Sequence, residues 1–289
     1  MSPSATMPRS CTDIPRALRR GVVLLAMLVA GLGTTAHAVT VSPTALYISA
    51  RSPSGLLTLV NTGSRTEEIE LSFGFGYPVS DTAGVLRVDV VDSAGKDEPS
   101  LAGWLRAFPR RLLLQPGQKQ VVRVTIVAPA GLADGEYWGR VLVKSRGGEP
   151  PIEQSQGQVK MQLSLETTFA TAVFYHKGDV HTGITVPTTS AQRTKNGVQF
   201  TLDLKREGNA AFLGHVKAEV VDSVGGTRAS MEDVVAVYRS LRRRFVIRSD
   251  KALPAGPLTV RWLVDTERPD LPALGPLHAA AVTGITPVR

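Results

Sequence analysis

The sequence predicts an all-β protein made of two β-sandwich domains that follow a cleaved signal peptide. Three observations lead to this prediction. A short apolar run lies near the N-terminus, short alternating segments separated by turn residues fill the rest, and 251 residues follow residue 38, which suits two domains of about 120 residues each. No segment has a convincing helical periodicity.

Residues 1 to 38 have the features of an export signal. Four arginines precede the apolar run of residues 21 to 33, and Ala36-His37-Ala38 forms an A-x-A cleavage site. The run is too short to cross a bilayer, which needs about 20 apolar residues. We expect cleavage after Ala38, loss of Cys11 with the signal, and a periplasmic protein that is not inserted in the membrane.

The charge of the chain is mildly basic. The net charge is +8 in all, and removing the signal leaves 29 basic and 24 acidic residues, or +5. This balance does not indicate a nucleic-acid-binding protein. Arg239 and the run of residues 242 to 244 form the one concentration of cations, which we interpret as a solvated strand or turn, with a specific anion site as the alternative.

The first domain is expected over residues 39 to 178. Its strands are predicted from the alternation of apolar with polar residues. They are expected at residues 39–49, 55–61, 68–75, 85–91, 112–114, 120–127 and 136–145. Pro116-Gly117 predicts a tight turn between two of them.

The next segment is the alternating stretch of residues 157 to 168. Its apolar positions are Val159, Met161, Leu163 and Leu165. The polar residues 146 to 157 before it predict a long loop. Two interpretations stay open: an ordinary half-buried strand, or an edge strand that offers its apolar side chains to a partner.

The alternating stretch continues to Tyr175, which is too long for one flat strand. We therefore expect a bulge or a switch between sheets near Thr167 or Thr168. A linker is expected near residues 176 to 187, where the composition turns to Gly, His and Thr.

The second domain is expected over residues 186 to 289 and is again all-β. Residues 222 to 226 predict a turn. Strands are expected at residues 198–204, 213–221, 234–238, 244–248, 257–264 and 278–283.

The sequence carries little that indicates catalysis. The histidines after the signal form no metal-binding pattern, and we expect His176 and His181, beside the linker, to be solvated. No nucleophile elbow, phosphate-binding loop or cofactor fingerprint occurs. We therefore expect a protein that is not an enzyme and has neither a metal nor a cofactor.

The order of several motifs in residues 39 to 176 resembles a known family. The first domain resembles the N-terminal domain of periplasmic pilus-assembly chaperones. The motifs that carry the resemblance are Asn61, Pro109, Pro116-Gly117, Arg123 and the alternating strand that runs into Phe174-Tyr175. The resemblance implies two immunoglobulin-like domains. It also implies that Val159, Met161, Leu163 and Leu165 form a donor strand lent to a secreted pilus-type subunit, with an outer-membrane usher as a further partner.

The family binds the terminal carboxylate of its subunit with an Arg and a Lys. The resemblance puts Ala45 and Ala172 at those two places, and neither can bind a carboxylate. Arg140 and Lys144 on the neighbouring strand are the candidate substitutes. We interpret Trp138, on the same strand, as a core residue.

Three hypotheses follow. The first is a periplasmic chaperone that completes the sheet of a pilus or fimbrial subunit by β-augmentation. The second is a structural or adhesive immunoglobulin-like secreted protein, which the missing basic anchors favour. The third is an extracellular enzyme or sugar-binding module.

Overall fold

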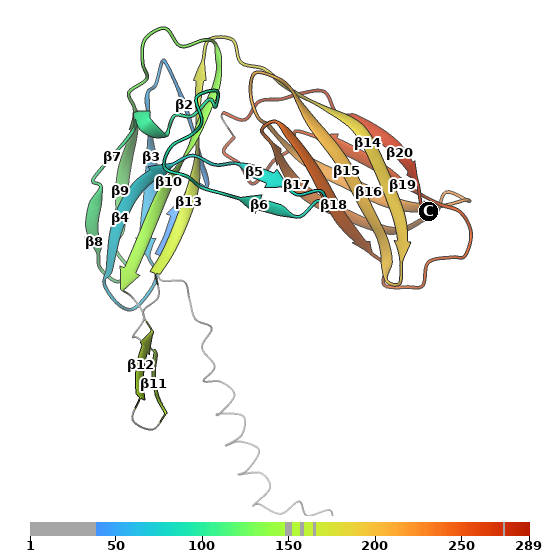
Figure 1. Ribbon diagram of the computed structural model, residues 1–289, viewed down its shortest axis with the longest axis horizontal. Coiled ribbons are helices and arrows are strands. Elements are labelled where there is room, and N and C mark those ends of the chain that lie inside the picture. The colour runs from blue at the N-terminus through green and yellow to red at the C-terminus, as the bar shows by residue number, and fades with distance from the viewer. Residues whose placement is uncertain (1–38, 148–151, 157–158, 164–165, 274) are drawn as a thin grey trace, which may run out of the picture. The chain divides into compact units, whose positions relative to one another are not determined.

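The computed structural model describes residues 39–147, 152–156, 159–163, 166–273 and 275–289. These residues are all-β, as predicted, apart from one turn of 3-10 helix, η1 (Ala102–Trp104). The strands form two β-sandwiches (Figure 1), which confirms the predicted fold class. The predicted signal peptide lies outside the described residues.

The first sandwich consists of two sheets. One has the strand order β1-β3-β9-β7 and the other the order β2-β13-β10-β4-β8. The strands are β1 (Val39–Ser42), β2 (Ala45–Ser49), β3 (Ser54–Asn61), β4 (Glu67–Gly74), β7 (Leu105–Phe108), β8 (Arg111–Leu114), β9 (Lys119–Ile126), β10 (Gly135–Gly147) and β13 (Glu166–Lys177).

Alternation decides which face of each strand is buried in this sandwich. Leu57 and Leu59 of β3 are fully buried in the same core cluster as Val141 and Val143 of β10. Side chains of this kind contribute about 1.5 to 3 kcal/mol each when they leave water. The core therefore holds the two sheets together and leaves the other face of β10, with Arg140, outside the core.

The chain passes from one sheet to the other at Pro43, between β1 and β2. Val39 pairs with Asn61 in one sheet, whereas Ala45 pairs with Ala172 in the other. Pro43 has no N–H to donate to a ladder, so a single strand over residues 39 to 49 is interrupted there. The prediction of one continuous strand was wrong at this residue.

The bulge or sheet switch predicted near Thr167 or Thr168 is absent from β13. The pairing of β13 with β10 runs without a shift from Glu166 to Lys177. Thr171, Val173 and Tyr175 are alternate residues and all three are buried. The same face of the strand therefore points to the core along this stretch, and no bulge is needed to turn it.

The loop predicted over residues 146 to 157 is also partly wrong. β10 extends to Gly147, and β11 (Ile152–Gln156) pairs with β12 (Val159–Leu163) as an antiparallel hairpin. The polar sequence of β11 gave no period-two signal, although its backbone forms a ladder. Strands also fill most of the expected linker, since β13 ends at Lys177 and β14 begins at Thr182.

Asn61 ties two turns to the edge of the first sandwich. Its side chain is fully buried, and its Nδ2 donates to the carbonyl oxygens of Arg65 at 2.7 Å and Leu114 at 2.8 Å. Its backbone oxygen accepts from the N–H of Gly117 at 2.9 Å. Gly117 has a φ of 72°, which favours glycine, and it forms the predicted turn with Pro116.

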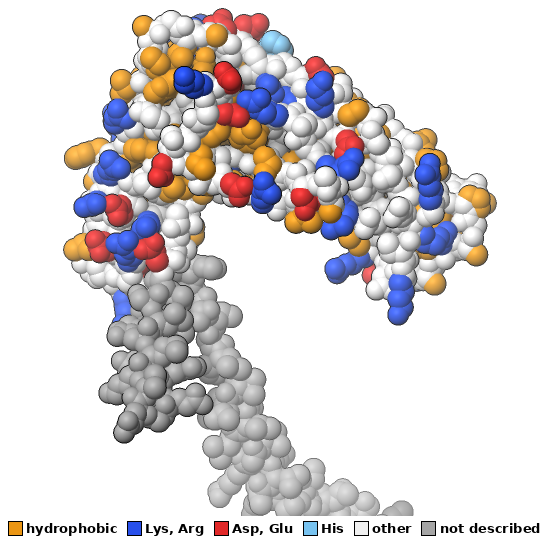
Figure 2. All heavy atoms as spheres, viewed as in Figure 1, with side chains coloured by type: hydrophobic (Ala, Val, Ile, Leu, Met, Phe, Trp, Pro, Cys, Tyr) orange, Lys and Arg blue, Asp and Glu red, His pale blue; other side chains and the backbone are white. Residues whose placement is uncertain are grey.

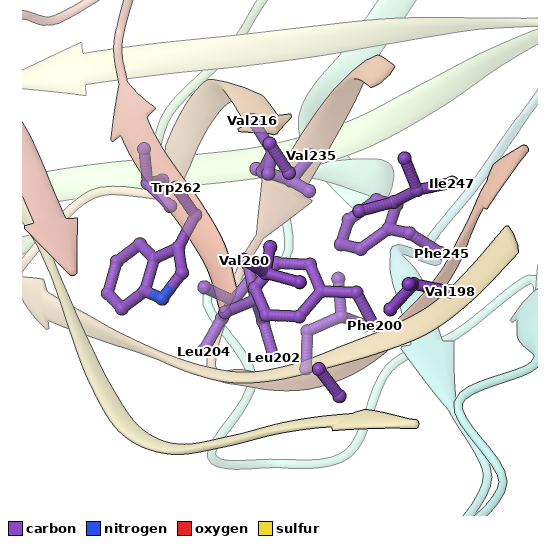
Figure 3. Close-up of a cluster of buried hydrophobic side chains, with 14 of the residues drawn as sticks. Val198, Phe200, Leu202, Leu204, Val216, Val235, Phe245, Ile247, Val260 and Trp262 are labelled. Atoms are coloured by element: carbon purple, nitrogen blue, oxygen red, sulfur yellow. The ribbon is translucent and has the colours of Figure 1, made fainter. Parts of the chain in front are cut away.

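The second sandwich pairs a three-stranded sheet, β14-β15-β18, with a four-stranded sheet, β17-β16-β19-β20. Its core is formed by side chains such as Phe200, Phe245 and Trp262, which pack between the two sheets (Figure 3). The predicted turn at residues 222–226 is present, with the Asp222 carboxylate accepting from the N–H of Gly226 at 2.8 Å. The strands are β14 (Thr182–Thr194), β15 (Gly197–Gly208), β16 (Phe212–Asp222), β17 (Thr227–Val237), β18 (Ser240–Arg248), β19 (Leu258–Asp265) and β20 (Val282–Pro287).

A separate hairpin, β5 (Pro78–Ser80) with β6 (Leu86–Val88), follows β4 and contacts β18 of the second sandwich (Figure 1). Arg242 of β18 donates its backbone N–H to Ser80 Oγ at 2.8 Å and its Nη1 to Thr82 O at 3.2 Å. The two carboxylate oxygens of Asp203 hold the same guanidinium at 2.6 and 2.7 Å. Arg242 is therefore exposed on a strand, as expected for this run of cations, and also forms specific contacts.

Candidate functional site

The strand β13 has an unpaired edge along its first half. It pairs with β10 over its whole length, but with β2 only over residues 172–176. The Ala172 N–H donates to Thr44 O at 3.2 Å on the β2 side. Because alternate residues of a strand point their main-chain groups the same way, Thr168 and Ala170 present theirs to the unpaired side. Among the described residues no strand occupies that side, so an added strand can pair there.

Four residues on neighbouring strands form one row across the outer face of this sheet. Ala172 of β13 lies opposite Ala45 of β2 on one side and opposite Arg140 of β10 on the other, and Arg140 lies opposite Gly74 of β4. We call these four residues the anchor row. The two alanines expected at the anchoring places are thus direct neighbours, and Arg140 is the residue of the row that carries a charge.

Arg140 retains donors that can bind a further group. Its Nε donates to Gly76 O at 3.0 Å, and the part of the chain that the structure describes places no carboxylate within ion-pair distance of its guanidinium. A guanidinium has five N–H donors, so most of them are free for a planar anion such as a carboxylate. The geometry therefore makes Arg140 a suitable carboxylate ligand beside Ala172.

Lys144, the second candidate, is placed differently. It lies opposite Thr168 on β13, and its Nζ pairs with Glu166 at 2.9 Å. Arg146 pairs with the same carboxylate, and these two cations hold the pKa of Glu166 below its usual range. Lys144 therefore already has an ion-pair partner, which it shares with Arg146, and this leaves Arg140 as the stronger candidate.

Six aromatic side chains pack together beside the anchor row, where Phe174 lies opposite Tyr47 and Trp138 two residues further along the strands. We call them the aromatic cluster: Tyr47, Phe75, Tyr77, Trp138, Phe174 and Tyr238. Tyr238 comes from the second sandwich and stacks on Tyr77 with ring centroids 5.2 Å apart, and it meets Trp138 edge-on at 5.0 Å. Such pairs contribute about 0.5 to 1.5 kcal/mol beyond their burial. The cluster therefore joins the two sandwiches next to the candidate site.

Burial shifts the pKa values of two tyrosines in this cluster. It raises the pKa of Tyr238 to about 12, and it also raises the pKa of Tyr47, to which the charge of Glu136 adds. Trp138 is 3% exposed, so its prediction as a buried apolar residue is confirmed, but it is buried in the aromatic cluster and not between the two sheets of the first sandwich. No local pattern indicates that Tyr77 and Tyr238 contact Trp138, because the three residues lie in separate segments of the chain.

A buried carboxylate forms a second link between the sandwiches. Glu136 of β10 is 4% exposed; its Oε2 lies 2.8 Å from His176 Nε2, and its Oε1 accepts from the N–H of Ala211 at 3.0 Å. The expectation that His176 is solvated was therefore wrong, because β13 extends past it and places its ring against Glu136.

The predicted donor strand is described only by its backbone. Val159, Met161 and Leu163 lie in β12 and pair with Gln156, Gln154 and Ile152 of β11. Leu165 lies outside the described residues. The role of these four residues stays a prediction.

The described residues contain no group of three or more His, Cys, Asp or Glu side chains that could hold a metal ion. Within the same residues no helix is long and apolar enough to cross a membrane. Lys and Arg side chains are spread among acidic ones over the face in Figure 2.

No protein-family model matches the sequence, and no curated protein matches it. Among solved structures, the chain is similar to the SafB chaperone bound to the SafA pilin of Salmonella enterica, with 13% identity over 88% of this chain and 98% of that chain, and a TM-score of 0.43. It is similar to a chain of the CsuC–CsuE chaperone and tip-subunit complex of Acinetobacter baumannii at 13% identity, 87% and 98% coverage and a TM-score of 0.42. It is similar to the CupB2 chaperone of Pseudomonas aeruginosa at 12% identity over 86% of this chain and 100% of that chain, with a TM-score of 0.41. The chain thus resembles pilus chaperones in structure over nearly the whole length of each, at low sequence identity.

Proposed function

We propose that this protein is a periplasmic chaperone that binds a secreted pilus-type or fimbrial subunit and completes the subunit's sheet with a strand. The observation that carries the proposal is the unpaired edge of β13 beside the anchor row. An extended segment can add to such an edge through main-chain hydrogen bonds and place alternate side chains on the sheet. In this proposal residues 1–38 are removed on export, and residues 39–178 and 186–289 are the two domains.

Two further features support the proposal. In the sequence, β13 is preceded by the alternating residues Val159, Met161, Leu163 and Leu165, which would extend the added ladder into the client. Arg140, in the same row as Ala172, offers free donors for the client's terminal carboxylate. An outer-membrane usher would then receive the complex.

A structural or adhesive secreted protein is the second candidate. The alanines at positions 45 and 172 favour it, because neither can bind a carboxylate and the row then has Arg140 as its single cation. In that case the β13 edge would have no client, and the two candidates differ in what the edge binds.

The experiment replaces one residue on the open edge. Ala170→Pro removes an N–H that faces the unpaired side and leaves the ladder with β10 intact, whereas Ala170→Val keeps the N–H and serves as the matched control. Both variants are purified from the periplasm, their melting temperatures are compared with the wild type, and co-purifying proteins are identified by mass spectrometry. The proposal expects a secreted subunit with the wild type and the Val variant and none with the folded Pro variant. Absence of any subunit from the wild type, or equal capture by the folded Pro variant, contradicts it.

A further inference from the structure

The hairpin that contains β5 and β6 is longer than its two strands. Phe75 and Val91 exchange both backbone hydrogen bonds, at 2.7 and 2.8 Å, and the Asp81 N–H donates to Val85 O at 3.2 Å. These pairs and the pairs of β5 with β6 share one antiparallel register. One side of residues 85–91 is therefore paired over residues 85–88 and again at Val91.

The other side of residues 85–91 is an open edge. Since Val91 and Val85 direct their main-chain groups to the inner strand, Leu86, Val88 and Val90 direct theirs outward. Within the described part of the chain no strand pairs with this side.

The same segment exposes large apolar side chains. Five of them, Val85, Leu86, Val88, Val90 and Val91, are between 38% and 51% exposed. An exposed apolar edge strand invites pairing, and a continuous apolar patch is typical of an interaction surface. This segment needs an occupant that supplies a strand.

We propose that the occupant is the same segment of a second copy of this chain, paired antiparallel about a two-fold axis at Val88. Leu86 would then lie opposite Val90 of the second copy, and Arg87 opposite Asp89 of the second copy. Val85 meets Val91 of the second copy at the ends. In this register the outward main-chain N–H and C=O groups of Leu86, Val88 and Val90 face the outward groups of the second copy. They can therefore form the hydrogen bonds of an antiparallel ladder.

Charge selects this register over its neighbours. Moving the two-fold axis by one residue places Arg87 opposite Arg87 of the second copy, or Asp89 opposite Asp89 of the second copy. Like charges directly opposite destabilise a strand pair, whereas opposite charges stabilise it. In one copy Arg87 and Asp89 already lie 2.8 Å apart and are both well exposed, so they are free to shift toward the second copy.

The proposed interface is small, because it consists of one short edge. Interfaces that bury less than about 1,200 Å² are weak and transient. We therefore expect a monomer–dimer equilibrium that depends on protein concentration. This dimerisation does not depend on the proposed chaperone function, because the dimer uses the edge of residues 85–91 and the chaperone function uses the edge of β13.

The test uses two charge-reversal variants. Each should weaken dimerisation on its own, and the two together should form a mixed dimer. Arg87→Glu gives two acidic residues in each copy, and Asp89→Arg gives two basic ones. Each variant alone should raise the dimer dissociation constant about tenfold, since two repulsive pairs replace two attractive ones. An equimolar mixture of the two should form a mixed dimer at least as tightly as the wild type. Ile285→Lys, at an exposed residue of β20, is the control and should change nothing.

The backbone part of the pairing has its own variant. Val88→Pro removes an outward N–H at the centre of the interface and none that the hairpin uses. Analytical ultracentrifugation of the full chain as it is exported, with circular dichroism to check folding, should find the wild type dimeric at high concentration and folded Val88→Pro monomeric. A wild type that is monomeric throughout, a folded Pro variant that still dimerises, or a mixture of charge variants that stays monomeric would overturn the proposal. So would a wild-type monomer that instead takes up an extended segment of another protein at this edge.

Discussion

Arg140 lies directly opposite Ala172 in the antiparallel pairing of β10 with β13, so a guanidinium and a methyl group share one row of the sheet. The cation that position 172 lacks is thus present one strand away, on the same face. The charge of the anchor row therefore lies at Arg140 of β10 and not at position 172 of β13. Whether a carboxylate binds this charge can be tested by substitution.

Arg140→Ala should weaken the binding of a client with a free terminal carboxylate by about tenfold or more, which is about 1.4 kcal/mol. The reason is that the free donors of Arg140 can form charge-assisted hydrogen bonds with that group. Amidation of the client's C-terminus should cause a similar loss in the wild type and no further loss in the variant. Isothermal titration calorimetry of the four combinations measures this coupling. Lys144→Ala is the control, because Lys144 already pairs with Glu166; if amidation changes affinity less than tenfold in the wild type, carboxylate capture contributes little and the anchor has been lost.

Met161→Ser combined with Leu163→Ser should lower the free energy of unfolding by less than about 2 kcal/mol and abolish co-purification of a client. Their strand β12 pairs only with β11 and is separate from the sheets of both sandwiches, so we expect little of the core to depend on it. Urea denaturation measures the stability.

Val141→Ser is the comparison for that double substitution, because Val141 is fully buried on β10 and its loss leaves a cavity and a buried hydroxyl. It should cost more than the double change. Unfolding of the double variant, or a folded double variant that still holds its client, removes the donor-strand interpretation.

Tyr238 should make the protein sensitive to alkali. Its pKa is raised to about 12 by burial, whereas a tyrosine in the unfolded chain ionises near 10. As pH rises above about 10 the unfolded chain loses this proton while the folded chain keeps it, so stability falls by about 2 to 3 kcal/mol between pH 10 and 12. Tyr238→Phe keeps the ring and should lose this part of the fall, as measured by urea denaturation at a series of pH values. Identical pH profiles for the two proteins would show that Tyr238 ionises as freely in the folded chain as in the unfolded one.

Asn61→Ala should lower the free energy of unfolding by about 2 to 4 kcal/mol. The substitution leaves the carbonyl oxygens of Arg65 and Leu114 without the Nδ2 donor, and the loss is greatest at Leu114, where the bond is buried and an unsatisfied group costs about 1 to 3 kcal/mol. Asn61→Asp should be at least as harmful, because it places a carboxylate beside the same two oxygens. Thermal and urea denaturation test both variants, and a loss under 1 kcal/mol for both would mean that water replaces the donor.

The strands with a clear apolar phase could be predicted from the sequence. In β15 the buried residues Val198, Phe200 and Leu202 alternate with polar residues, so both the strand and its buried face follow from local order. The break at Pro43 carried a usable signal, namely the missing N–H, that the prediction did not use. β11 carried none, because its residues are almost all polar and only the pairing with β12 defines it.

The candidate site depends on contacts that a single sequence does not contain. Ala45 and Ala172 are far apart in the chain, and only the parallel pairing of β2 with β13 makes them neighbours. The resemblance named both positions and identified the strand of Arg140 as the adjacent one, which the pairing of β10 with β13 confirms. The contact between Tyr77 and Tyr238 could not be predicted from local sequence, because it depends on how the two sandwiches pack together.

The hairpin of residues 75–91 has a mechanical consequence. Its root follows directly from the end of β4 in the first sandwich, and its tip is hydrogen-bonded to Arg242 of the second. A ladder that is fixed at both ends works as a strut: any bending between the sandwiches must either flex the ladder or pull Ser80 and Thr82 away from Arg242. Force applied to one sandwich is therefore carried to the other partly through these hydrogen bonds, alongside the aromatic cluster and the bond from Ala211 to Glu136.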